Sequence, residues 1–186
     1  MADFVLSSGS ICRPHRSPWG AFPTRSFGVS TGTSSNGVIL GRRVTLDYTE
    51  AGNTTNAAYV KGSTGAPHFN LAGITAENGN QSTAVAGTPV SVWECNPLVE
   101  FKAATIGAVL ASSNVGQSKK LNFDSTLNIE VVDLTASTAA DHRVVITQLI
   151  DNPGDSGGYV AFRFVPNRAD QGSTVLSSTP FLAFYR

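Results

Sequence analysis

The sequence predicts an all-β protein, with an antiparallel β-sandwich or jelly-roll-like domain over residues 38–186 behind an extended, irregular N-terminal arm over residues 1–37. Three observations support this prediction. Branched and aromatic residues alternate with polar ones in short runs, as in strands with one buried face. Turn-forming clusters of Gly, Asn, Ser and Pro separate these runs at fairly regular intervals. Signals for helices are few, so a sandwich or barrel is the expected architecture.

The first 37 residues show no sustained periodicity. Three prolines and five glycines lie among Ser and Thr, and such a stretch cannot bury enough apolar surface to fold alone. It nevertheless contains aromatic residues that a plain linker would lack: Phe4, Trp19, Phe22 and Phe27. We therefore expect an arm that becomes ordered on a partner surface. A disordered tail, or aromatic side chains that fold back onto the protein's own sandwich, are the alternatives.

From residue 38 onward the pattern favours strands. Within the segment that follows Gly158, Val160 and Phe162 fall on one face while Ala161 and Arg163 fall on the other. Proline cannot donate to a strand ladder, so Asn96-Pro97 should break its run or lie on an edge. Lys119-Lys120 are expected in a solvated turn. The runs predicted as strands are 38–48, 68–76, 88–103 (interrupted at Pro97), 127–137, 142–150, 158–166 and 179–186.

Composition narrows the possible partners. Charged residues make up 14% of the chain, below the roughly 25% of soluble domains, which suits a protein that packs against others. Thirteen basic and thirteen acidic groups cancel, so no overall field attracts nucleic acid or a membrane. No secretory signal pattern is present, and no apolar run approaches the ~18 residues of a membrane span.

The sequence offers no cofactor or metal site. Cys12 and Cys95 have neither metal-binding spacing nor a C-x-x-C arrangement, and free thiols are favoured over a disulfide between them. No Gly-rich loop lies between a strand and a helix, so a phosphate cradle is not expected.

The stretch G-D-S-G-G at residues 154–158 resembles the segment around the nucleophile of chymotrypsin-like serine proteases. Such chemistry needs a base, an orienting acid and an oxyanion hole. Backbone N–H groups of Gly154 and Ser156 could supply the oxyanion donors. His15 lies in the Pro-rich arm, and His142 would break the family's order of His, Asp and Ser. The least unsuitable base is His68, and the acids between it and the serine include Asp124 and Asp133.

A turn between two strands accounts for the same stretch without catalysis. Asn152 and Asp155 can bond their own backbone, and the glycines accept positive φ. The sequence therefore favours a hairpin between residues 142–150 and 158–166, and no residue is predicted to be catalytic.

The block from Trp93 to about Val165 resembles the virion decoration, or cement, proteins of tailed bacteriophages, particularly phages of cyanobacteria and other aquatic bacteria. The resembling stretches are NPLVEFKA (96–103), SSNVG (112–116), LNFDST (121–126) and DSGGYVAFRF (155–164).

The resemblance implies a small β protein, often a homotrimer, that holds the outside of an assembled head over junctions between major capsid subunits. It implies a non-enzymatic virion protein, made in the host cytoplasm, whose partners are the major capsid protein and copies of itself. Large aromatics anchor interfaces, and arginines bind carboxylates. The expected partner-binding residues are Arg13, Arg16, Trp19, Phe22, Arg25 and Phe27. Alternatives are a viral serine protease using Ser156, a jelly-roll coat protein and a tail component.

Overall fold

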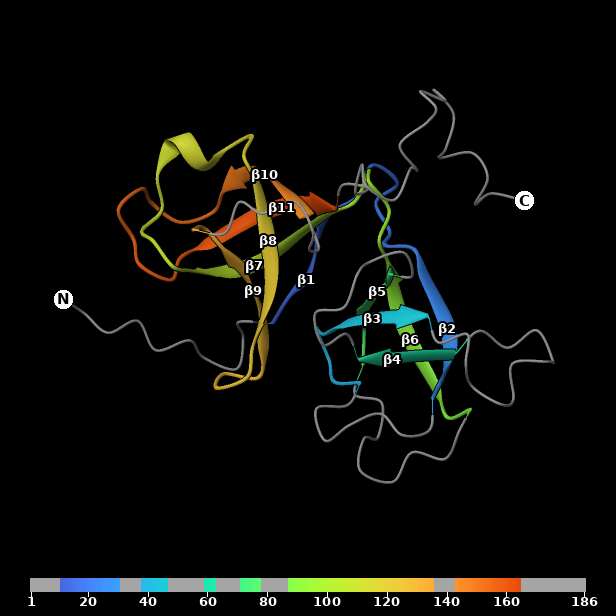
Figure 1. Ribbon diagram of the computed structural model, residues 1–186. Helices are drawn as coiled ribbons and strands as arrows, with labels where there is room; N and C mark the ends of the chain where they lie inside the picture. Colours follow the sequence, from blue (N-terminus) through green and yellow to red (C-terminus); the bar gives the residue numbers. More distant parts are fainter. Residues whose placement is uncertain are drawn as a thin grey trace, which may run out of the picture.

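The computed structural model describes residues 11–30, 38–46, 59–62, 71–77, 87–135 and 143–164. The prediction of an all-β protein is confirmed: eleven strands and a short 3-10 helix, η2 (Ser112–Asn114), make up the elements in these ranges. The strands form two sheets, each closing into a small barrel (Figure 1). No helix in the described ranges is long and apolar enough to cross a membrane.

Barrel A contains the C-terminal strands. Its order is β7 (Glu100–Ile106), β11 (Tyr159–Phe164), β10 (Arg143–Leu149), β8 (Ser118–Asp124) and β9 (Ile129–Asp133). The neighbours in this order are antiparallel, and a parallel pairing of β9 with the second half of β7 closes the barrel. The N-terminal strand β1 (Arg13–Arg16) pairs with the first half of β7.

Barrel B contains the remaining strands. Its order is β2 (Thr24–Val29), β4 (Tyr59–Gly62), β3 (Arg43–Leu46), β5 (Leu71–Thr75) and β6 (Pro89–Glu94), and β6 returns to β2. The pairing of β2 with β4 is parallel and the others are antiparallel.

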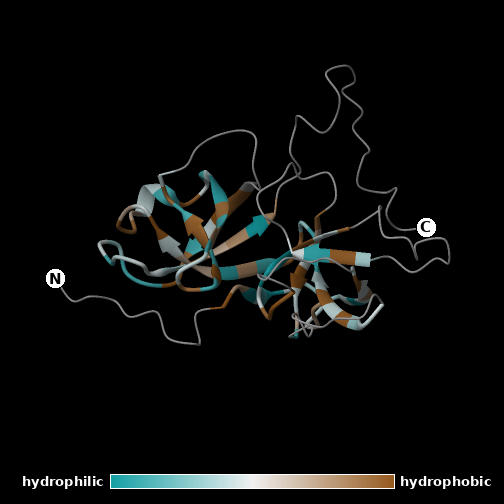
Figure 2. Ribbon diagram, turned by 60° about the horizontal axis from the view of Figure 1, so that its bottom comes forward, coloured by the Kyte–Doolittle hydropathy of each residue, from teal (hydrophilic) through white to brown (hydrophobic). Residues whose placement is uncertain are grey.

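Each barrel has its own apolar core. In barrel A, Phe101, Phe162 and Phe164 pack together with ring centroids 5.2–6.2 Å apart. In barrel B the core contains Phe27 and six valines, including Val29 and Val44. Figure 2 shows apolar stretches on the strands of both barrels. Ile74 of β5 belongs to the barrel A cluster, so the two barrels are in apolar contact.

The irregular N-terminal arm is not what the structure shows for residues 13–16 and 24–29. These residues form β1 and β2, which pair with β7 and β6. The sequence pattern missed them because each strand is short and its antiparallel partner lies more than 60 residues away. Pro14 is tolerated in β1, since a proline needs no donor on the outer edge of a sheet. Deleting residues 1–37 would therefore remove strands from both barrels. Residues 1–10 and 31–37 lie outside the described ranges.

Other strand predictions have mixed outcomes. The break at Pro97 is confirmed, because a turn with Val99 N–H donating to Asn96 O separates β6 from β7. The solvated turn expected at Lys119-Lys120 is wrong: both residues lie in β8, between β9 and β10. The predicted strand at 179–186 lies outside the described residues.

Candidate interaction surface

A group of cations lies on the outward face of β1, β7 and β11. Arg13 pairs with Lys102 across β1 and β7, and Arg16 pairs with Glu100. On the other side of β7, Arg163 Nη2 donates to Glu100 Oε1 at 3.1 Å. Opposed residues of paired strands project from the same side of a sheet, so these side chains share one face. We refer to Arg13, Arg16, Lys102 and Arg163 as the cationic face.

A β-bulge in β1 gives this face its composition. The register shifts between Pro14 and Arg16, so His15 is the extra residue. Residues three apart in a regular strand would project to opposite sides. The bulge therefore turns Arg16 to the same side as Arg13, while Pro14 pairs with the core residue Phe101.

Two carboxylates partly neutralise the positive charge of the cationic face. Glu100 is largely buried between Arg16 and Arg163. The pKa of the Lys102 ammonium is lowered by partial burial and by the positive charge of Arg13, and Asp151 opposes that shift. The cations still outnumber the carboxylates on and beside this face, so the face is net positive.

The neighbouring cations also act on His15. Burial first, and then the charges of Arg16 and Lys102, lower the pKa of its imidazole below the ordinary 6.5. A lowered pKa means that the folded chain releases this proton more readily than the unfolded chain, so His15 is neutral at pH 7.

We expect Arg16→Gln to raise the pKa of His15 back toward 6.5, because the substitution removes a nearby positive charge. NMR titration of the imidazole measures this value, and added salt should shift the wild-type value in the same direction. Arg25→Gln, on barrel B, serves as the control and should leave the pKa of His15 unchanged. An equal effect of both substitutions would contradict the assignment of the His15 shift to the charge of Arg16.

Two exposed apolar side chains lie beyond one end of the β1–β7 ladder. Trp19 follows β1 in a turn and is 54% exposed; Leu98 precedes β7 in another turn and is 52% exposed. Because Arg16 pairs with Glu100, the end of β1 and the start of β7 are neighbours. Trp19 and Leu98 therefore flank the same end of the cationic face.

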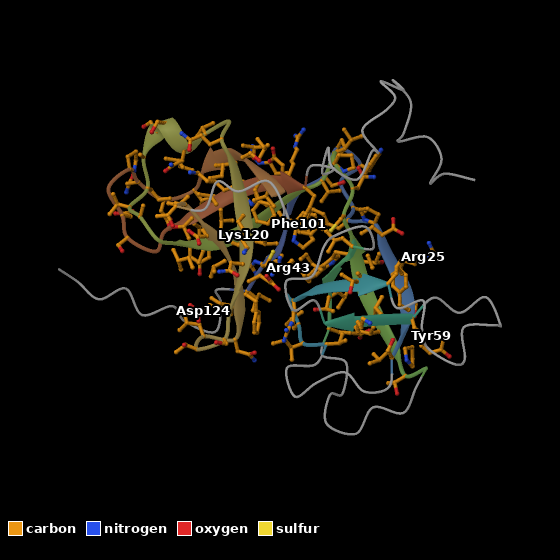
Figure 3. All side chains as sticks on the ribbon, in the orientation of Figure 1. Arg25, Arg43, Tyr59, Phe101, Lys120 and Asp124 are labelled. Atoms are coloured by element: carbon orange, nitrogen blue, oxygen red, sulfur yellow. The ribbon has the colours of Figure 1, made fainter. Side chains whose placement is uncertain are left out.

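The other predicted partner-binding residues are divided between surface and core. Arg25 is exposed on β2 of barrel B, with its guanidinium carbon 5.4 Å from the Phe27 ring centroid (Figure 3). Phe27 is 6% exposed in the core of barrel B, so the prediction that it contacts a partner is wrong; it packs against the chain's own valines. Phe22 is half-buried against the barrel A core.

The G-D-S-G-G stretch forms the loop of the β10–β11 hairpin, as the turn interpretation predicted. Gly154 N–H donates to Leu110 O, in the segment that follows β7, at 2.7 Å, so this predicted oxyanion donor already has an acceptor. The Asp155 carboxylate accepts the Asn152 N–H at 3.0 Å. Ser156 is exposed and bridges Val109 beyond the C-terminal end of β7.

His15 does not approach Ser156. It lies beside the start of β7, whereas Ser156 lies past the end of β7, a separation on the order of 20 Å along the strand. His68 and His142 lie outside the described residues. Asp124 accepts N–H groups of Thr126 and Leu127 in the β8–β9 turn, and Asp133 accepts from Thr135.

A buried ion pair joins the two barrels, and sequence reasoning did not predict it. Arg43 of β3 places its Nε 2.7 Å from Glu130 Oε2 of β9, and both side chains are at most 2% exposed. Arg43 Nη1 also donates to Leu121 O at 2.7 Å. Beside it, the Arg42 guanidinium carbon lies 3.9 Å from the centroid of the Phe123 ring. Figure 3 shows Arg43 at the junction of the barrels.

Both cysteines are free thiols, as the sequence favoured. Cys12 is fully buried in the barrel A cluster and Cys95 packs against that cluster. Burial raises the pKa of both thiols, so they stay protonated at neutral pH. Within the described ranges, no three His, Cys, Asp or Glu residues are grouped as metal ligands.

No protein-family model matches this chain, and searches of curated proteins and of solved structures also give no match.

Proposed function

We propose that this chain is a structural virion protein that binds the exterior of a phage capsid and stabilises it. The observation that carries the proposal is the extent of the sequence resemblance to decoration proteins. Residues 93–165 span all five strands that close barrel A, from β7 to β11. The resembling segment thus includes every strand that closes this barrel, and it also bears two half-buried cations of the cationic face, Lys102 and Arg163.

The low charge content of the chain suits this role, because a protein that packs against a lattice needs less charge to stay soluble. The major capsid protein is the proposed partner, together with copies of the chain in a homotrimer. On a symmetric shell each contact recurs, so many weak contacts act together. A β-sandwich or jelly-roll arrangement of the sheets is part of the same proposal.

Quantitative mass spectrometry of purified virions tests the function. We expect on the order of hundreds of copies per particle, because every symmetric junction of a shell offers the same site. About a dozen copies or fewer would indicate a tail component instead. Absence from the particle would overturn the proposal.

The protease alternative rests on the G-D-S-G-G stretch alone. Peptide hydrolysis that is lost in Ser156→Ala and retained in Ser113→Ala, an exposed serine of η2, would favour it.

A further inference from the structure

We infer that the cationic face of β1, β7 and β11 is the docking surface of this chain, and that its partner is a carboxylate-bearing protein surface. The assignment moves the predicted contact from an extended arm to a rigid sheet. It adds two residues that sequence reasoning missed, Lys102 and Arg163, and leaves Arg25 outside the contact.

The geometry of the face supports this assignment. Arg13 and Lys102 form one transverse pair, and Arg16, Glu100 and Arg163 form the next. Successive pairs along a strand that project from one face are about 7 Å apart, so the four cations gather within a small area. An arginine fork fits a carboxylate with two parallel hydrogen bonds. The sheet fixes the backbone positions of these cations before binding, which lowers the entropy that binding must overcome.

The surroundings favour protein over nucleic acid. Glu100 and Asp151 lie among the cations, where a continuous row of phosphates would meet like charge. The chain as a whole has no net charge, so it lacks the field that draws a protein to a polyanion. Exposed Trp19 and Leu98 flank the face, and interfaces between proteins combine aromatic anchors with arginine in this way.

The test uses the full chain and two probes, poly-L-glutamate and duplex DNA at equal concentrations of charge. Wild-type protein should bind polyglutamate more tightly than DNA, and added salt should weaken the binding. Arg13→Gln with Arg16→Gln should weaken polyglutamate binding at least about tenfold, because two charge-assisted contacts are lost. Quenching of Trp19 fluorescence reports binding, with Trp19→Phe as the reference for signal from Trp93.

Arg25→Gln with Lys61→Gln is the matched control, since it removes two exposed cations from barrel B. The affinity of this control variant for polyglutamate should stay within about twofold of that of wild type. If the double β1 variant loses its circular dichroism signature, polyglutamate binding is measured on Lys102→Gln instead. Tighter binding to DNA, an equal loss in the control, or no binding of wild type to polyglutamate would each overturn the inference. The inference deepens the proposed function, but its test needs no virion, so the two can fail separately.

Discussion

Glu130→Ala should lower the free energy of unfolding by about 3–5 kcal/mol, measured by urea denaturation. The substitution leaves the guanidinium of Arg43 buried without the carboxylate 2.7 Å from its Nε, and uncompensated buried charge is costly. Glu100→Ala is the control, because its partner Arg163 is 43% exposed and keeps access to water. The control substitution should lower the free energy of unfolding by about 1 kcal/mol or less.

A double variant distinguishes the energetic effect of the unpaired buried charge from the effect of lost packing. Replacing both partners, with Arg43→Met and Glu130→Leu, should recover much of the loss, since apolar residues of similar volume need no pairing. Glu130→Ala costing no more than Glu100→Ala would show that the pair is not buried as described.

The ion pair also predicts a pH dependence. Burial raises the pKa of Glu130 above its ordinary value of 4.5, and the attraction of Arg43 only partly offsets this. Between 4.5 and the raised value the folded chain binds more protons than the unfolded chain, so this carboxyl's contribution to stability falls as pH rises through that window. Glu130→Gln should remove that dependence, which unfolding curves at several pH values would show as a difference in slope from wild type.

Gly73→Ala should destabilise barrel B by about 3 kcal/mol or more. A Cβ at this position would lie 2.0 Å from Trp93 O and 2.7 Å from Val92 Cγ1. The carbonyl belongs to the backbone of β6, so the clash is relieved only by separating β5 from β6 where Gly73 pairs with Glu94. The near-UV circular dichroism of Trp93 reports this separation directly.

Gly20→Ala is the control for the second substitution. Its φ is 71° and nothing lies within 4 Å of the added Cβ, so only left-handed backbone strain of about 1–2 kcal/mol is expected. Equal losses at the two positions would contradict the close approach of β5 to β6.

The strands of barrel A were predictable where their own alternation was strong. Val160, Phe162 and Phe164 point inward as the period of two indicated. The strand β8 was not predicted, because its two adjacent lysines indicated a solvated turn. Leu121 and Phe123 of the same strand alternate just as regularly, and Leu121 lies in the core of barrel A. That element could have been found by weighting the apolar positions over the charged pair.

The candidate surface was only partly predictable. Arg13, Arg16 and Trp19 were named from residue type, and all three are exposed. That Lys102 lies beside Arg13 depends on a pairing across almost 90 residues, and no local pattern encodes such a register. The approach of Arg43 to Glu130 depends on two barrels meeting, for the same reason.

The strand β1 has a consequence for how the polypeptide folds during synthesis. It is synthesised before the other described strands, yet its ladder partner β7 follows some 85 residues later, and β2 gains its antiparallel partner β6 only some 60 residues later. Contacts of such high sequence separation make folding slow, because loop closure must precede any gain from pairing. Until then the backbone N–H and C=O groups of this segment are exposed without strand partners. We expect a chaperone to protect the segment during this period.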